Sequence, residues 1–194
     1  HEVSFNLVRR LLLSDQSDEA KLLLEEIVAL DGNGEAGLNA KNRLANMAFA
    51  SGKIEEGDSL LQQVLAVEPD NADAVVTESK RLLLDGKTDD AIAKLRAVLK
   101  ANPNSPAVLG LLGKAHEQQG RIELAIDQYA KANRVDSGNQ AVALSYTRLL
   151  IKLKRYSQAE EVLKGLLVTS PADSSALKLM AQIKLTLQDC EGAQ

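Results

Sequence analysis

Three prolines recur at one fixed spacing in this chain of 194 residues. Pro69 and Pro103 lie 34 residues apart, and Pro171 follows Pro103 at twice that distance. A constant period of this size is typical of an array of structural repeats and constrains the fold more than any other feature here. Dividing the length by the period gives 5.7, so the chain suits five repeats and part of a sixth.

Further columns of residues follow the same period. Gly52, Gly86 and Gly120 recur in one column, and Lys154 takes its next position. A second column holds small residues: Ala20, Gly57, Ala91, Ala125, Ala159 and Ala193. Apolar residues follow four and then seven positions later, which places them on one face of a helix. The first step of this column is 37 residues, so three extra residues lie within 32–37.

Each repeat is predicted to contain two helices. The glycine column marks the turn between them, because glycine tolerates the positive φ that ends a helix. Acidic residues then open the second helix, and the proline column closes it. Ser105 and Asp173 are the expected caps of the helices that follow them. The expected repeats span 1–34, 35–71, 72–105, 106–139, 140–173 and 174–194, as a single all-α array whose last repeat stops just inside its second helix.

Composition excludes several classes of protein. The chain is 45% hydrophobic, which is too apolar for a disordered segment. It has no apolar run approaching the roughly 18 residues that span a membrane. A net charge of −4 and an aromatic content of 3% disfavour a nucleic-acid binder. The single cysteine, Cys190, excludes an internal disulfide framework and is interpreted as a packing residue.

No catalytic or cofactor motif is complete. Gly86-Lys87-Thr88 resembles the end of a phosphate-binding loop but follows no strand, and the upstream glycine is replaced by Arg81. His116 has no second histidine or cysteine nearby, which favours a packing role over metal binding. We therefore expect no enzyme activity, no metal site and no cofactor.

A calcium-loop pattern near the extra residues is also incomplete. Asp31, Asn33 and Glu35 have the spacing of early ligands in such a loop. The sixth and twelfth positions, where glycine and glutamate are needed, hold Ala36 and Asn42. A solvated turn is the expected structure.

The fourth repeat carries a resemblance to the tetratricopeptide repeat family. It holds the residues that this family places in its two helices: Leu109, Leu112-Gly113, Ala125, Tyr129 and Ala132. His116 stands where the family usually has an aromatic residue, and Lys41 stands at a usually apolar position. The resemblance covers the whole chain and implies an α-solenoid, in which antiparallel helix pairs stack into a right-handed superhelix. It also implies a concave groove lined by the first helix of each pair.

The columns that line the groove in this family give the candidate binding residues: Arg9, Arg43, Asn46, Lys80, Lys114, Arg148, Lys152, Lys178, Leu111 and Leu144. Basic residues dominate this set although the chain is acidic overall. A basic stripe beside apolar side chains suits an acidic peptide, with charge steering its approach. The alternative is that these cations are merely solvated.

A subtype of the family grips the carboxylates of chaperone tails with lysines and asparagines. Asn42 and Asn46 fall in neighbouring columns, but Asp73 and Thr77 stand where the basic residues of the subtype would be. A chaperone-tail adaptor is therefore disfavoured.

The expected function is a non-catalytic scaffold that binds a protein or peptide in the groove, in the style of bacterial envelope, secretion or exopolysaccharide-export assemblies. The alternatives are a docking domain of a larger enzyme and a binder of an anionic polymer. Bacterial periplasm or cell envelope is preferred over cytoplasm. The chain begins at His1 and stops within a repeat, so we expect a piece of a longer protein that self-associates through its cut last repeat.

Overall fold

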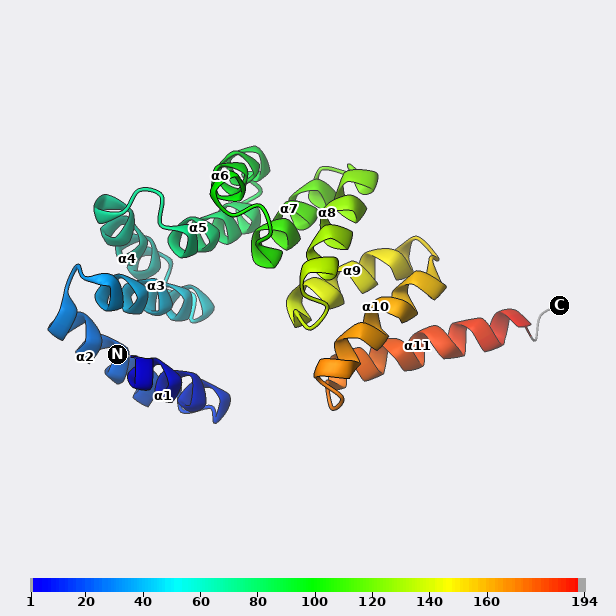
Figure 1. The fold of residues 1–194 in the computed structure, drawn as a ribbon, viewed down its shortest axis with the longest axis horizontal. Coiled ribbons are helices and arrows are strands. Elements are labelled where there is room, and N and C mark those ends of the chain that lie inside the picture. The colour runs from blue at the N-terminus through cyan, green and yellow to red at the C-terminus, as the bar shows by residue number, and fades with distance from the viewer. Residues whose placement is uncertain (1, 192–194) are drawn as a thin grey trace. The chain divides into compact units, whose positions relative to one another are not determined.

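The computed structural model describes the backbone of residues 2–191 and the side chains of residues 4–187. Within that part the chain forms eleven α-helices and no strand, which confirms the predicted all-α class (Figure 1). The chain divides into two compact units, residues 1–81 and residues 82–194. The side chain of Cys190 and all of Ala193, both used in the repeat columns, lie outside the described residues.

The helices alternate between first and second members of each pair. The first helices are α1 (Glu2–Leu13), α3 (Glu35–Ala50), α5 (Ala72–Leu84), α7 (Pro106–Gln118), α9 (Gln140–Lys152) and α11 (Ser174–Glu191). The second helices are α2 (Ser17–Asp31), α4 (Ile54–Val67), α6 (Thr88–Ala101), α8 (Ile122–Val135) and α10 (Tyr156–Thr169). The boundary between the two units falls inside α5.

The turn inside each pair has the left-handed residue that the glycine column predicts. Gly52, Gly86 and Gly120 have φ values of 73°, 75° and 69°. Asp15 and Lys154 adopt φ of 59° at the equivalent turns although neither is glycine. The residue after each of them donates its backbone N–H to the carbonyl five positions earlier, as Lys53 does to Ala48 at 2.9 Å. This bond supplies a donor to a carbonyl in the last turn of the first helix.

The ends of the pairs also follow the sequence prediction. α4, α6 and α10 each end two residues before a proline of the column. Ser105 caps α7, because its hydroxyl accepts a hydrogen bond from the N–H of Val108. Asp173 caps α11 by accepting from the N–H of Ala176 at 2.8 Å, and this bond lowers the pKa of its carboxyl.

The three extra residues lengthen α3. This helix has 16 residues, whereas α7 has 13. Asp31 caps the added turn, since its Oδ2 accepts a hydrogen bond from the N–H of Gly37 at 2.9 Å. Lys41 is buried, and its Nζ donates to Oδ1 of Asn33 at 2.9 Å. The extra segment thus supplies the polar partner for a lysine at a usually apolar position.

Each unit has its own apolar core around the small-residue column. In the first unit Ala20 and Leu24 pack with Val8 and Leu44. In the second unit Ala125 and Ala159 are fully buried within one larger cluster that spans α7 to α11. Tyr129 lies in this cluster and stacks on Tyr146 with ring centroids 5.9 Å apart.

The last helix differs from the prediction. The glycine column places a turn near Gln188, but α11 continues through that position to Glu191. Leu177 and Leu185 are exposed on this helix. Self-association through the last repeat remains a prediction.

Candidate functional site

The predicted cations of the second unit lie on first helices that contact one another. Lys114 is on α7, Arg148 and Lys152 are on α9, and Lys178 is on α11. α7 contacts α9, and α9 contacts α11. All four side chains are exposed, and none has an ion pair or hydrogen bond with the described residues. The first-helix surface of this unit therefore presents four unneutralised positive charges.

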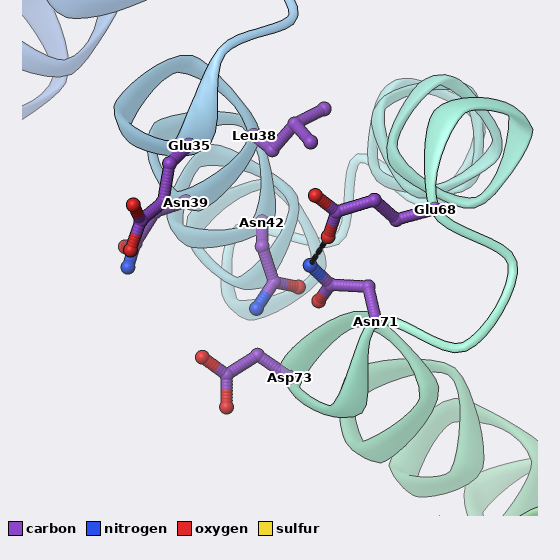
Figure 2. Close-up of a pocket in the computed structure, with 7 residues that line it drawn as sticks. All are labelled: Glu35, Leu38, Asn39, Asn42, Glu68, Asn71 and Asp73. Atoms are coloured by element: carbon purple, nitrogen blue, oxygen red, sulfur yellow. Dashed lines mark hydrogen bonds between the residues drawn. The ribbon is translucent and has the colours of Figure 1, made fainter.

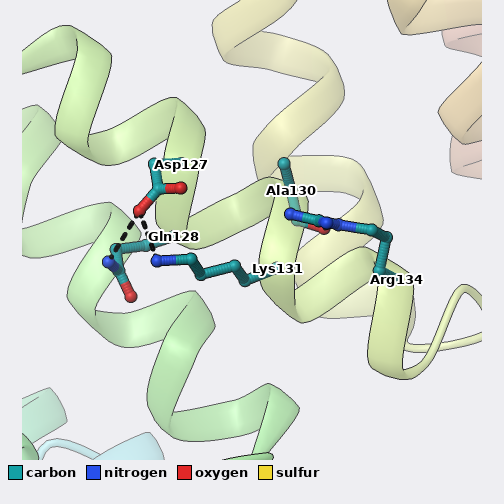
Figure 3. Close-up of polar contacts among 5 residues, drawn as sticks. All are labelled: Asp127, Gln128, Ala130, Lys131 and Arg134. Atoms are coloured by element: carbon teal, nitrogen blue, oxygen red, sulfur yellow. Dashed lines mark hydrogen bonds and ion pairs between the residues drawn. The ribbon is translucent and has the colours of Figure 1, made fainter.

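Two lysines on second helices of the same unit are paired with acids one turn away. On α8, Lys131 Nζ lies 2.7 Å from Oδ2 of Asp127, which also accepts a hydrogen bond from Gln128 (Figure 3). On α10, Lys164 pairs with Glu160 at 2.9 Å, and this pairing lowers the pKa of Glu160. These i,i+4 pairs neutralise charge on the helix that carries it. Among the first-helix cations only Lys114 has an acid one turn away, Glu117, and no ion pair joins these two side chains.

The two leucines predicted for the site are less accessible than expected. Leu111 is half-buried on α7. Leu144 is only 8% exposed and packs in the core of the second unit. The prediction that Leu144 offers apolar surface to a partner does not fit this burial, because the neighbouring helices cover its side chain.

Some predicted site residues of the first unit have no interaction partner among the described residues, and others already contact residues of the same unit. Arg9 on α1 and Lys80 on α5 are exposed and have no partner among the described residues. The guanidinium of Arg43 lies 4.8 Å from the ring centroid of Phe5, and its Nε donates to Oδ1 of Asn39. Asn46 joins α3 to α5, since its Nδ2 donates to Oγ1 of Thr77 at 3.0 Å. Arg43 and Asn46 thus already have intramolecular roles.

A polar pocket of about 310 Å³ lies in the first unit, and the set of predicted site residues missed it. Its lining comes from α3, the α4–α5 connection and the start of α5: Glu35, Leu38, Asn39, Asn42, Glu68, Asn71 and Asp73 (Figure 2). Three of these residues carry carboxylates, three carry amides, and none is basic. The signal in the sequence was Asp73, an acid at a column where a carboxylate-binding subtype has a basic residue.

Local hydrogen bonds hold one wall of this pocket. Asn71 caps α5 by accepting from the N–H of Ala74 at 3.0 Å, and its Nδ2 donates to Oε2 of Glu68 at 2.7 Å. The hydroxyl of Thr77 donates to the backbone carbonyl of Asp73 at 2.9 Å. These bonds fix the connection before α5 to the first turns of α5.

The structure provides no set of residues for metal chemistry within the part that it describes. No group of three or more His, Cys, Asp or Glu side chains there could hold a metal ion. His116 is 3% exposed, and burial, with added repulsion from Arg96 and Arg121, lowers its pKa. The carboxylate of Asp31, which belongs to the incomplete calcium-loop pattern, serves as a helix cap. No helix among residues 2–191 has the length and apolar character needed to cross a membrane.

Comparisons with known proteins identify the repeats. The family described as the cytochrome c-type biogenesis protein H TPR domain matches residues 78–194. The cytochrome c-type biogenesis protein CcmH of Haemophilus influenzae is 29% identical over 116 residues, which are 56% of this chain and 25% of that protein. The TPR repeat-containing protein YpiA of Bacillus subtilis is 22% identical over 76% of this chain and 34% of its own length. The chain therefore spans about a quarter and about a third of the lengths of these two relatives.

Solved structures show the same fold. PilW, a type IV pilus biogenesis factor, matches with a TM-score of 0.74 at 15% identity, over 99% of this chain and 88% of that one. PilF of Pseudomonas aeruginosa matches with a TM-score of 0.69 at 19% identity, over 98% and 85%. The tetratricopeptide resemblance is confirmed, and since the family match covers more than half of the chain, this protein belongs to the cytochrome c-type biogenesis protein H TPR family.

Proposed function

We propose that this chain is a non-catalytic module that binds a protein partner during cytochrome c-type biogenesis, using the exposed surface of its first helices. The observation that carries this proposal is the group of unpaired cations Lys114, Arg148, Lys152 and Lys178 on contacting helices. Proteins of the tetratricopeptide type are generally non-catalytic scaffolds, which supports a binding role.

The proposed partner segment for the second unit is acidic. Four positive charges without an ion-pair partner among the described residues repel one another, and a carboxylate-rich segment relieves that repulsion as it binds. Exposed charges of this kind mainly raise the rate of encounter, and salt weakens them. Half-buried side chains such as Leu111 supply the apolar part of the contact, because Leu144 is buried by neighbouring helices.

We infer a location at the bacterial cell envelope. The support is the family name and the relative from Haemophilus influenzae, both of which concern cytochrome c-type biogenesis, together with the pilus-biogenesis protein PilW among the structural neighbours.

The test neutralises the first-helix cations in the gene that encodes the full protein. Lys114→Gln, Arg148→Gln and Lys152→Gln together should lower the cellular content of c-type cytochromes, measured by haem staining. The matched control replaces three exposed cations of second helices, Arg96→Gln, Lys100→Gln and Arg134→Gln. Equal cytochrome content in both triple variants, at equal amounts of the protein, would rule out this surface as the binding site.

A further inference from the structure

The pocket between α3 and α5 has acceptors without a matching donor. Asn42 is 8% exposed, and its Oδ1 has no hydrogen-bond partner among the residues that the structure describes. Its side chain extends from α3 toward Asn71 and Asp73 (Figure 2). A buried acceptor that lacks a donor costs free energy, so a ligand with an N–H group in this pocket would relieve that cost.

The charged residues that line the pocket with Asn42 are all acidic. Glu35 and Asp73 are exposed at the first turns of α3 and α5, and neither has an ion pair or hydrogen bond from its carboxylate to the described residues. Glu68 accepts one hydrogen bond, from Asn71. An anionic group is therefore repelled from this pocket, whereas a cation gains both Coulomb attraction and charge-assisted hydrogen bonds.

The two cations that flank Asn42 in the chain are directed elsewhere. Arg43 lies over the ring of Phe5 and donates to Asn39, and it does not line the pocket. Lys41 donates to Asn33 in the extra segment before α3. The protein thus leaves this group of carboxylates without a basic residue in the lining.

We propose that the pocket receives the positively charged side chain, arginine or lysine, of a bound protein segment. The ammonium or guanidinium group donates to Oδ1 of Asn42, and the carboxylates of Glu35, Glu68 and Asp73 surround its charge. This inference rests on the proposed function only in that the cation belongs to a protein partner. It adds a requirement for a basic residue in that partner.

The test titrates the full 194-residue chain with short blocked peptides while side-chain amide resonances are followed by NMR. The probes are acetyl-Gly-Arg-Gly-amide and acetyl-Gly-Lys-Gly-amide, with acetyl-Gly-Gln-Gly-amide as the neutral control. The Asn42, Asn39 and Asn71 amide signals should shift with the cationic peptides and not with the neutral one. Comparison of the two cationic probes shows which side chain is preferred. Equal shifts with all three peptides, or none, overturn the proposal.

A pair of double variants separates the pocket from general acidity. Glu35→Gln with Asp73→Asn should weaken binding of the cationic peptide about tenfold, since each exposed charge contributes modestly. Glu55→Gln with Asp90→Asn is the matched control, because these acids also occupy the first turns of helices, α4 and α6, outside the pocket. Equal weakening in both would overturn the proposal.

Asn42→Leu provides a readout that a purely structural role would not give. It removes the unpaired acceptor while filling a similar volume, so thermal stability should be kept or raised while peptide binding is lost. Retained binding in this variant would contradict the role of Asn42. Because these measurements use isolated peptides, they remain decisive whatever the result for the cations of the second unit in cells.

Discussion

The α3–α5 pair and the α7–α9 pair occupy equivalent positions in the repeat, twice the 34-residue period apart, yet their facing surfaces differ in chemistry. In the α3–α5 pair the facing residues include Asn39, Asn42 and Asp73, and they line a pocket. The residues 68 positions later are Ala107, Gly110 and Ala141. One repeat geometry therefore supports a polar pocket in the first unit and an apolar contact in the second.

Close packing explains why the second unit has no counterpart of Asn42. A Cβ atom built on Gly110 would lie 2.7 Å from Cγ2 of Val142. The residue equivalent to Val142 in the first unit is Ala74, whose smaller side chain leaves space beside α3. The size of the side chain at this one position, valine or alanine, thus decides whether the space beside the preceding first helix is filled or open.

Among the changes that test this comparison, overfilling the core of the second unit should have the largest effect on stability. Ala125→Leu places three extra carbon atoms where the side chain is fully buried, and we expect a loss of about 1–3 kcal/mol of stability. Urea unfolding followed by circular dichroism measures it. Ala141→Leu, at an exposed position of α9, is the control and should change stability little. Equal midpoints for both variants would contradict the assigned packing.

In the first unit the cap on the lengthened helix is the next most sensitive point. Asp31→Ala removes the acceptor for the N–H of Gly37 and should cost about 1 kcal/mol. Asp31→Asn keeps an acceptor oxygen and should cost less. Thermal unfolding of the two variants tests this order, and the reverse order would show that the carboxylate does not act as the cap.

The turn at Lys154 offers a stabilising change in the second unit. Lys154 has a φ of 59°, which is strained for a residue with a Cβ. Lys154→Gly should therefore stabilise by roughly 0.5–1 kcal/mol, the strain relief being partly offset by the greater freedom of glycine when unfolded. Gly120→Ala, at an equivalent turn, should destabilise. A loss of stability in Lys154→Gly would show that the backbone at Lys154 is not strained.

The smallest effect concerns the acid sensitivity of the second unit. The pKa of His116 is lowered from 6.5 in the folded chain, so the unfolded chain takes up a proton first as pH falls. The contribution of His116 to stability is constant above that value and decreases as pH falls below it. His116→Phe should show a smaller decrease in unfolding midpoint between pH 7.5 and pH 5 than the parent. An identical decrease would show that His116 does not contribute.

The repeat columns predicted the fold closely because they report local physics. Glycine at a turn and proline after a helix act on the residues beside them, so Gly52, Gly86 and Pro103 marked helix ends correctly. Asp15 and Lys154 take the same turn conformation without glycine, which shows that packing of the pair can impose it.

The site was less predictable because it depends on contacts between helices. The burial of Leu144 follows from how its neighbours pack, which a column of one helix does not report. Asp31 was expected to lie in a solvated turn, whereas its carboxylate accepts a hydrogen bond from the N–H of Gly37. Asn42 was noticed only as a residue near the columns of a carboxylate-binding subtype, and Asp73 only as a departure from it. Their shared pocket emerged from the three-dimensional structure.

The lengthened α3 shows how a repeat protein acquires a new site at small structural cost. Three added residues extend a helix by about 4.5 Å and are contained by one cap and one buried lysine. The turn and the columns that follow keep their 34-residue period. Glu35, at the first position of that added turn, reaches the pocket as a result. Insertion at the start of a first helix is thus a route by which one repeat diverges in specificity while its neighbours keep theirs.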